Sequence, residues 1–207
     1  MTGAEIAATV TPPPTPWIMR GRMFMGLFRV KSGTAAALPA GLTPVLAGHR
    51  VVAVVRYLEG TLSYNELIIG RMTRRGRKVA LFIDHIWVDS RESVAGGRRI
   101  WGLPKELADF SWHGDTVAVR DDLGAVATFT VDQRPAFWPE VGVSTPGFGV
   151  RDGQLLFFVG RVRARLRGTS LRIVSLDPRF GELSPKPWLG FDGAPFELNI
   201  GDARVLD

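Results

Sequence analysis

The feature that most constrains the fold of this chain is a series of extended segments of similar length. Residues 22–30, 49–58, 64–72 and 78–88 are rich in β-branched and aromatic side chains, which favour strands. The sequence TRRGR separates the last two segments, and its glycine is typical of a hairpin turn. We therefore expect the first half of the chain to consist mainly of antiparallel strands.

The same pattern continues in the second half of the chain. Residues 116–131 have the composition of another hairpin, and residues 155–168 and 170–176 add two more extended segments. Residues 196–206 can close the sheet. Many strands of similar length, separated by short turn sequences, predict a barrel or a sandwich.

Helices and domain boundaries contribute little to this organisation. A turn or two of helix fits within residues 33–42, and a short helix can begin near Ser90. Residues 1–16 end in a run made only of proline and threonine and are expected to form a flexible N-terminal arm. Residues 17–207 are then expected to form a single, mainly β domain of the α+β class, with residues 135–148 as a long ordered loop.

Composition excludes several kinds of protein. The chain has no cysteine, so disulfides and thiol catalysis are ruled out, which fits a reducing cytoplasm. No stretch reaches the roughly 18 consecutive apolar residues that a membrane helix needs. The N-terminus lacks the basic start and apolar centre of a secretory signal. We expect a cytoplasmic protein without a membrane partner, and the net charge of +6 allows an anionic substrate.

Metal and hydrolase chemistry is not indicated by the motifs. The three histidines, His49, His85 and His113, have no spacing that suits a metal site. The chain has neither a nucleophile elbow of the G-x-S-x-G type nor a phosphate-binding P-loop. No metal site is therefore predicted.

One segment carries arginine at every second position. Arg161, Arg163, Arg165 and Arg167 alternate with apolar residues, so a strand would place all four on one face. A solvated sheet face is the preferred interpretation. A nucleic-acid partner is disfavoured, because the aromatic residues or basic module that usually accompany such a surface are not evident.

Lys105 is the residue most suggestive of chemistry. The chain contains only four lysines beside 22 arginines, yet Lys105 follows a proline within the largely apolar segment 100–110. Apolar neighbours would desolvate the amine, and Arg98 and Arg99 lie close in sequence; both effects favour the neutral amine. A neutral amine can attack a ketone and form a Schiff base. The alternative is a lysine at an element boundary with its amine in water.

The sequence GRRIWGLPKELADF resembles the signature of the acetoacetate decarboxylase family, G-R-E-x-W-G-[FY]-P-K-K-L-[AG]. Lys105 occupies the position of the family's Schiff-base lysine. The sequence SYNEL resembles the family's tyrosine–x–glutamate segment, which makes Glu66 the counterpart of an active-site acid. The family's active-site arginine precedes its first strand, so Arg20, or else Arg22, is the corresponding residue. The resemblance covers most of residues 17–206.

The resemblance implies an antiparallel β-barrel of the acetoacetate decarboxylase-like type and a lyase that acts on a small oxo acid. Lys105 would form an imine that serves as an electron sink, so no cofactor is expected. Carbon dioxide or an aldehyde would then leave, and dehydration could follow. Arg20 could hold a substrate carboxylate, and Glu66 could move protons. A homo-oligomer is also implied.

Three departures from the family pattern leave the reaction open. Glu106 replaces the family's second lysine, Arg99 stands where the family has glutamate, and a second upstream acid is missing. A non-catalytic or ligand-binding member of the same fold is the alternative. On an extended chain neighbouring side chains point to opposite faces, so we expect Glu106 to face away from Lys105, toward Arg98 or Arg99.

Overall fold

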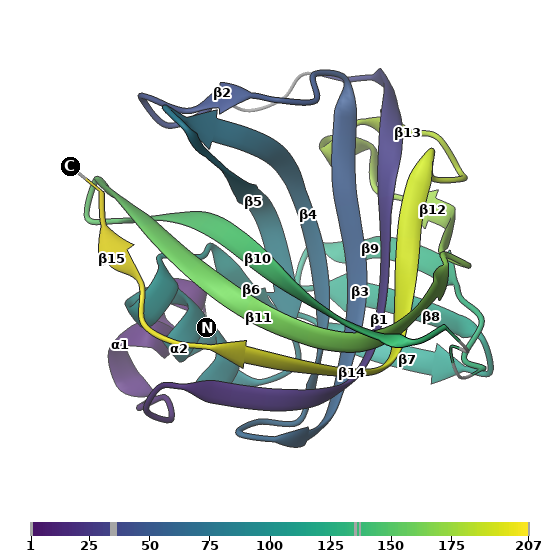
Figure 1. The fold of residues 1–207 in the computed structure, drawn as a ribbon, viewed down its shortest axis with the longest axis horizontal. Coiled ribbons are helices and arrows are strands. Elements are labelled where there is room, and N and C mark those ends of the chain that lie inside the picture. Colours follow the sequence, from purple (N-terminus) through teal and green to yellow (C-terminus); the bar gives the residue numbers. More distant parts are fainter. Residues whose placement is uncertain (1, 34–36, 135, 137, 207) are drawn as a thin grey trace.

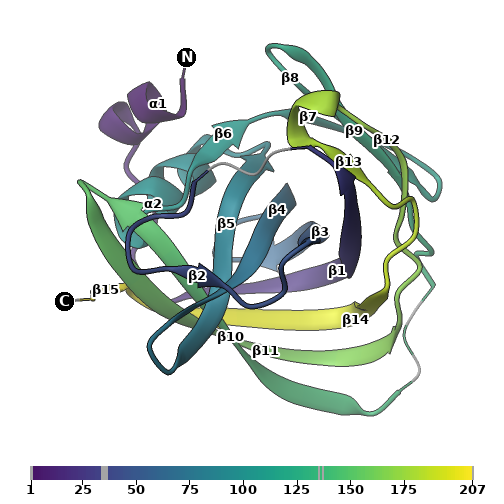
Figure 2. The same cartoon turned by 90° about the horizontal axis from the view of Figure 1, so that it is seen from above.

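A ring of strands encloses the centre of the molecule, as the computed structural model shows for residues 2–33, 37–134, 136 and 138–206 (Figures 1 and 2). Around the ring, the order is β3–β1–β14–β11–β10–β5–β4, and the pairing of β4 with β3 closes it. The members are β1 (Trp17–Ser32), β3 (His49–Gly60), β4 (Tyr64–Arg75), β5 (Lys78–Val88), β10 (Glu140–Arg151), β11 (Gln154–Gly168) and β14 (Leu189–Ile200).

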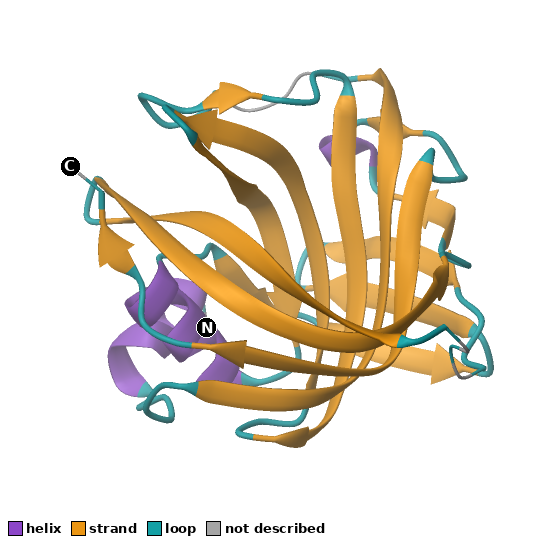
Figure 3. Cartoon of the chain, viewed as in Figure 1, coloured by secondary structure: helices purple, strands orange, loops and turns teal. Residues whose placement is uncertain are grey.

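The expected fold class is confirmed: the chain is mainly β, forms a barrel and has few helices (Figure 3). The barrel is not purely antiparallel, because β5 pairs in parallel with both β10 and the short strand β6 (Lys105–Leu107). Three other short strands attach to the ring: β2 (Thr43–Pro44), β13 (Glu182–Leu183) and β15 (Arg204–Val205).

A second, smaller sheet covers one side of the barrel from outside, at the right in Figure 1. Strand alternation explains both faces of the barrel wall. On β1, Trp17 and Met19 belong to the cluster inside the ring, whereas Phe24 and Phe28 pack toward the outer sheet. The outer sheet consists of β12 (Arg172–Leu176), β9 (Gly124–Thr130), β8 (Thr116–Asp121) and β7 (Asp109–His113), and the short 3-10 helix η1 (Pro178–Phe180) follows β12.

The helix expected near Ser90 is present as α2 (Arg91–Trp101). The Ser90 side chain accepts a hydrogen bond from the backbone N–H of Ser93, which is a standard N-cap. Gly102 ends the helix in the left-handed conformation, with φ of 66°. The chain then turns directly into β6, so the cap and the glycine together fix where Lys105 enters the structure.

The N-terminal segment differs from the flexible arm that we expected for residues 1–16. Gly3–Thr9 forms a helix, α1, whose first turn is closed by a reciprocal capping box between Thr2 and Glu5. Ile6 is completely buried against the inner cluster. The buried Ile6 and the hydrogen bond from the Gly3 N–H to Glu106 dock this helix on the rest of the molecule, and the proline-rich stretch that follows does not reveal it.

Three further expectations are corrected or lie outside the described residues. The segment 135–148 is not one long loop, because β10 begins at Glu140 and pairs with β11 along its whole length. Arg167 shares the outer face of β11 with Arg161, Arg163 and Arg165, but it is buried there beside Asp192 and is not solvated. The turn of helix expected within 33–42 falls partly on residues 34–36, which are outside the described residues, and residues 37–42 form no helix.

Candidate active site

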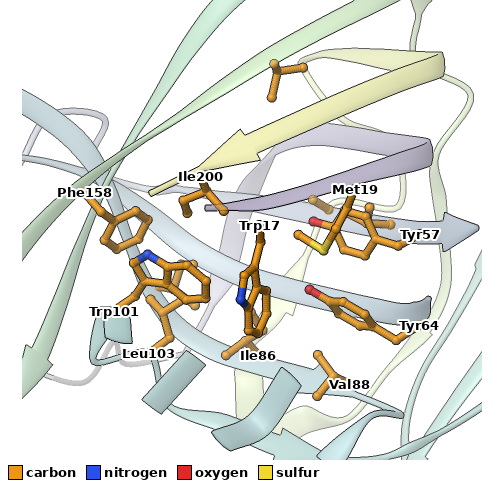
Figure 4. Close-up of a cluster of buried hydrophobic side chains, with 14 of the residues drawn as sticks. Trp17, Met19, Tyr57, Tyr64, Ile86, Val88, Trp101, Leu103, Phe158 and Ile200 are labelled. Atoms are coloured by element: carbon orange, nitrogen blue, oxygen red, sulfur yellow. The ribbon is translucent and has the colours of Figure 1, made fainter. Parts of the chain in front are cut away.

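The ring encloses a cavity of about 170 Å³ whose wall is predominantly apolar. Trp17 and Trp101 meet edge to face there, with 4.8 Å between ring centroids (Figure 4). Strands β1, β3, β4, β11 and β14 contribute inward-facing side chains, among them Met19, Met23, Met25, Val55, Phe158 and Phe196. An apolar wall lowers the local dielectric constant and so strengthens electrostatic interactions inside the cavity.

Lys105 reaches this cavity from β6, and only 3% of its surface is exposed. Its aliphatic stem passes along α2 at Gly97, where a Cβ atom would lie 2.4 Å from the Lys105 Cδ atom. A side chain at position 97 would therefore displace the lysine. Gly97, the first residue of the sequence GRRIWGLPK, thus has a steric role: it leaves the space through which the lysine stem runs.

The Lys105 amine has three polar partners. Its Nζ atom lies 2.6 Å from Oε2 of Glu66, 2.9 Å from Oγ of Ser93 and 3.4 Å from the hydroxyl of Tyr64. Glu66 is also 3% exposed, so the two charges form a buried ion pair. The structure therefore brings together the lysine and the glutamate that the sequence indicated.

Two tyrosines frame the carboxylate. The Tyr57 hydroxyl lies 3.3 Å from Oε1 of Glu66, and the Tyr64 hydroxyl lies 3.4 Å from Oε2. Their rings are neighbours, with centroids 4.6 Å apart (Figure 4). Burial raises the pKa of both phenols well above the ordinary value of 10.0, and the negative charge of Glu66 raises each further. Both tyrosines thus stay protonated and serve as hydrogen-bond donors.

Glu106 lies on the opposite side of β6, as expected. Its carboxylate pairs with Arg98, and it accepts a hydrogen bond of 2.8 Å from the backbone N–H of Gly3. Arg98 also donates a 2.7 Å hydrogen bond from Nε to the carbonyl of Lys105. Glu106 therefore anchors α1 and α2 to β6, and the acid that faces the amine is Glu66.

The structure does not place Arg20 where a substrate-binding role needs it. Its side chain is 53% exposed and forms an ion pair with Glu197, at 2.7 Å, on the outer face of β1. Arg22 also lies on that face and donates to the carbonyl of Gln133. Since successive side chains alternate across a strand, Met19 takes the inward direction and Arg20 the outward one. The expected carboxylate clamp is thus separated from Lys105 by the barrel wall.

Tyr57 and Ser93 complete the polar group and were not found from the sequence. Tyr57 pairs directly with Tyr64 across the β3–β4 hairpin, so the register of that hairpin would have indicated it. Ser93 lies in the first turn of α2 and is completely buried. Nothing in its local sequence sets it apart from an ordinary helix residue.

Two kinds of feature were not found among the described residues. No group of three or more histidine, aspartate or glutamate side chains within them is arranged to hold a metal ion. None of the helices in the described ranges is long and apolar enough to cross a membrane.

Comparisons with known proteins bear on the family and on the fold. A family model described as acetoacetate decarboxylase matches residues 4–140, whereas no curated protein matches the chain. Among solved structures, acetoacetate decarboxylase from Legionella pneumophila is similar, with a TM-score of 0.72 and 19% identity over 96% of this chain and 90% of that chain.

Two further solved structures share the fold. An acetoacetate decarboxylase-like enzyme from Sphingomonas wittichii RW1 has a TM-score of 0.60 and 15% identity, over 96% of this chain and 97% of that chain. The enduracididine biosynthesis enzyme MppR, complexed with pyruvate, has a TM-score of 0.56 and 18% identity, over 96% and 92%. At these identities the likeness establishes the fold alone.

Proposed function

The chain belongs to the acetoacetate decarboxylase family, and from this premise we propose that it is a lyase that forms a Schiff base between Lys105 and a small oxo compound. The observation that carries the proposal is the Lys105 amine, which is buried in an apolar cavity and lies 2.6 Å from a carboxylate. The other three lysines, Lys31, Lys78 and Lys186, are exposed. Lys105 is thus the one lysine whose amine is buried and lies against a group that can take up its proton.

Glu66 supplies the proton transfers of the first step. Moving one proton from the Lys105 Nζ atom to Oε2 of Glu66 converts the ion pair into an amine and a carboxylic acid. The amine then attacks the substrate ketone to give a carbinolamine. When the Glu66 acid returns its proton to the carbinolamine hydroxyl, water leaves, and a positively charged iminium forms beside the Glu66 carboxylate.

The iminium then accepts the electron pair of a bond one carbon away. If that bond is to a carboxylate, carbon dioxide leaves; if it is to a hydroxyl-bearing carbon, an aldehyde leaves. In both cases the electron pair moves to nitrogen and an enamine forms. Protonation of the enamine carbon and hydrolysis of the resulting imine release the product and restore Lys105, so the sequence of steps needs no cofactor.

An oxo acid is the substrate class that the family resemblance implies. The similarity to MppR, which was solved with pyruvate, supports an oxo compound of that size. The substrate-binding role expected for Arg20 has no support in the position of its side chain. We therefore base the proposal on Lys105 and Glu66.

Trapping by borohydride tests the proposal. The protein is incubated with pyruvate, acetoacetate, and uncharged ketones of similar size, reduced with borohydride, and digested for mass spectrometry. We expect one adduct on Lys105, with the mass of the substrate or of its decarboxylated product less one oxygen atom. A Lys105→Met variant should fold and show no adduct, and the matched control Lys78→Met should trap like the parent. Labelling confined to the exposed lysines, or no labelling with any compound, would contradict the proposal.

A non-catalytic member that only binds a ligand is the second candidate. The observation that favours it is the set of protein partners that already surrounds the Lys105 amine, namely Glu66, Ser93 and Tyr64. Such a protein would bind an oxo compound without forming an imine. Thermal stabilisation by a ligand that never yields a borohydride adduct would identify it.

A further inference from the structure

We infer that the cavity selects an uncharged carbonyl compound with an apolar body about as large as a benzene ring. The inference rests on the proposed Schiff base at Lys105 and specifies its substrate. It departs from the oxo acid that the family resemblance implies. The observations that carry it are the charge balance of the cavity, the positions of the nearby arginines, and the size and chemistry of the wall.

The first observation is the charge balance. Among the described residues that line the cavity, Lys105 is the one basic side chain and Glu66 the one carboxylate, and the two charges of their ion pair cancel. The iminium that replaces the ammonium keeps this balance, because it again faces the Glu66 carboxylate. A substrate carboxylate would add a negative charge without a partner. Burying an unpaired charge in an apolar site is strongly unfavourable.

The second observation is that the nearest arginines of β1 cannot supply the missing cation. Arg20 is paired with Glu197, and Arg22 is bonded to the carbonyl of Gln133, both on the outer side of the barrel wall. Rotation about side-chain bonds does not carry a residue through the strand to which it belongs. The inward positions of the same strand are occupied by Met19, Met23 and Met25.

The third observation is the size and chemistry of the wall. An apolar cavity of about 150 Å³ is known to hold benzene, and this cavity measures about 170 Å³. Three methionines line it beside Trp101 and Phe158. Methionine is flexible and makes favourable contacts with aromatic rings. A ring or a short branched chain attached to the carbonyl would therefore fit this wall.

The inference also assigns the bond that breaks. An uncharged substrate has no carboxylate to lose, so cleavage takes place at a carbon that bears a hydroxyl group. The Glu66 carboxylate accepts the hydroxyl proton, and the carbon–carbon electron pair moves to the iminium nitrogen. An aldehyde leaves and the enamine of an apolar ketone remains. The reverse sequence is an aldol addition between two apolar carbonyl compounds.

Matched pairs of compounds test the inference in the unmodified protein. Methyl levulinate is compared with levulinate, methyl acetoacetate with acetoacetate, and cyclohexanone serves as a ring-sized probe. Rates of borohydride-trapped adduct formation at Lys105 are divided by the rates with a free alkylamine, which removes intrinsic reactivity. We expect each ester to exceed its acid by about 100-fold, since an unpaired buried charge costs several kcal/mol, and cyclohexanone to match the esters.

The outcomes separate the inference from the proposed function. Acids that form the Lys105 adduct as fast as their esters would overturn the inference and leave the Schiff-base proposal intact. A panel in which neither acids nor neutral ketones form an adduct would overturn both.

A pair of variants gives a second, independent readout. Met25→Arg places a cation among the inward residues of β1, and it should raise trapping of levulinate relative to its ester by at least about 10-fold. The matched control Arg20→Met removes an arginine from the outer face of the same strand and should leave the ratio unchanged. A ratio that falls in Arg20→Met would overturn the inference, because it would give the outer arginine a part in binding acids. If Met25→Arg does not fold, the inference is accepted or rejected on the ester-to-acid rate ratios of the unmodified protein and of Arg20→Met.

Discussion

Two buried carboxylates in this protein have different surroundings. Asp192, on β14, is completely buried and accepts short hydrogen bonds from Thr169 Oγ1 at 2.9 Å and from Ser170 at 2.9 Å (N–H) and 2.6 Å (Oγ). Arg167 lies directly opposite on β11 and adds a contact of 3.3 Å. Glu66 has one short contact, to Lys105 at 2.6 Å, and two long ones to tyrosines.

The difference separates a structural carboxylate from a reactive one. The oxygens of Asp192 are occupied by donors fixed in the backbone or in short side chains, so the group holds a strand end and the following loop together. Glu66 faces a cavity, and its one short contact is to an amine that can lose its proton. A buried acid with fixed short donors stabilises the fold, whereas one that shares a proton with a single base can act chemically.

The largest effect is expected from removing the charge of Glu66. Glu66→Gln keeps the size of the side chain but takes away the proton acceptor, so adduct formation at Lys105 should fall by about 10²- to 10⁴-fold. Borohydride-trapping kinetics at several pH values would measure the loss. An adduct rate within a factor of two of the parent would show that Glu66 does not move protons.

Replacing the carboxylate of Asp192 by an amide should lower the stability of the fold and leave adduct formation at Lys105 unchanged. Asp192→Asn removes one carboxylate partner of Arg167, which keeps its contact with Asp132, and weakens the hydrogen bonds from Thr169 and Ser170, so the loss should be about 1.5–3 kcal/mol of the free energy of unfolding. Urea unfolding followed by circular dichroism would measure the loss. Adduct formation per folded molecule should match the parent. A large fall in the adduct rate of the folded variant without urea would mean that Asp192 also contributes to the reaction at Lys105.

A pH titration compares the surroundings of the two acids without a trapping reagent. The chain has two tyrosines, Tyr57 and Tyr64, and the pKa of both is raised well above 10.0, first by burial and then by the Glu66 charge. Below pH 10 the folded and unfolded chains carry the same phenol protons. Above it only the unfolded chain loses them, so stability falls by up to about 1.4 kcal/mol per pH unit for each tyrosine.

The near-ultraviolet absorbance of tyrosinate follows this titration, with circular dichroism as the check on unfolding. In Glu66→Gln the negative charge is gone, so tyrosinate should appear at lower pH than in the parent. In Asp192→Asn the tyrosines should titrate as in the parent for as long as the protein stays folded. Tyrosinate formation near pH 10 in the folded parent would contradict the buried arrangement.

The smallest effect is expected at Arg20. Its ion pair with Glu197 is exposed, and such pairs contribute at most about 1 kcal/mol. Arg20→Ala should therefore change the midpoint of urea unfolding only slightly and leave the trapping of oxo acids unchanged. A loss of acid binding greater than about 10-fold would restore the role that the sequence suggested for this residue.

Much of the fold and part of the site could be predicted from local sequence. The strands at 49–58, 64–72 and 78–88 follow from runs of β-branched and aromatic residues, and the helix start at Ser90 follows from a capping residue. The lysine motif singled out Lys105 and, by the position of the next residue, also predicted that Glu106 points away from it. These features depend on neighbours within a few residues, and a sequence contains that information directly.

Only the tertiary structure decided which residues share the cavity. Met19 and Arg20 are adjacent, and a change of one residue in register would exchange their faces, so the sequence alone could not tell which one meets Lys105. Tyr57, Glu66, Ser93 and Lys105 come from four different elements that the closed ring brings together. The sequence determined that a lysine would be desolvated by its neighbours. The barrel decided that Glu66, which the family resemblance had indicated, lies against this lysine, and that no arginine of the described residues lines the cavity. Contacts between distant segments depend on strand pairing and not on local pattern.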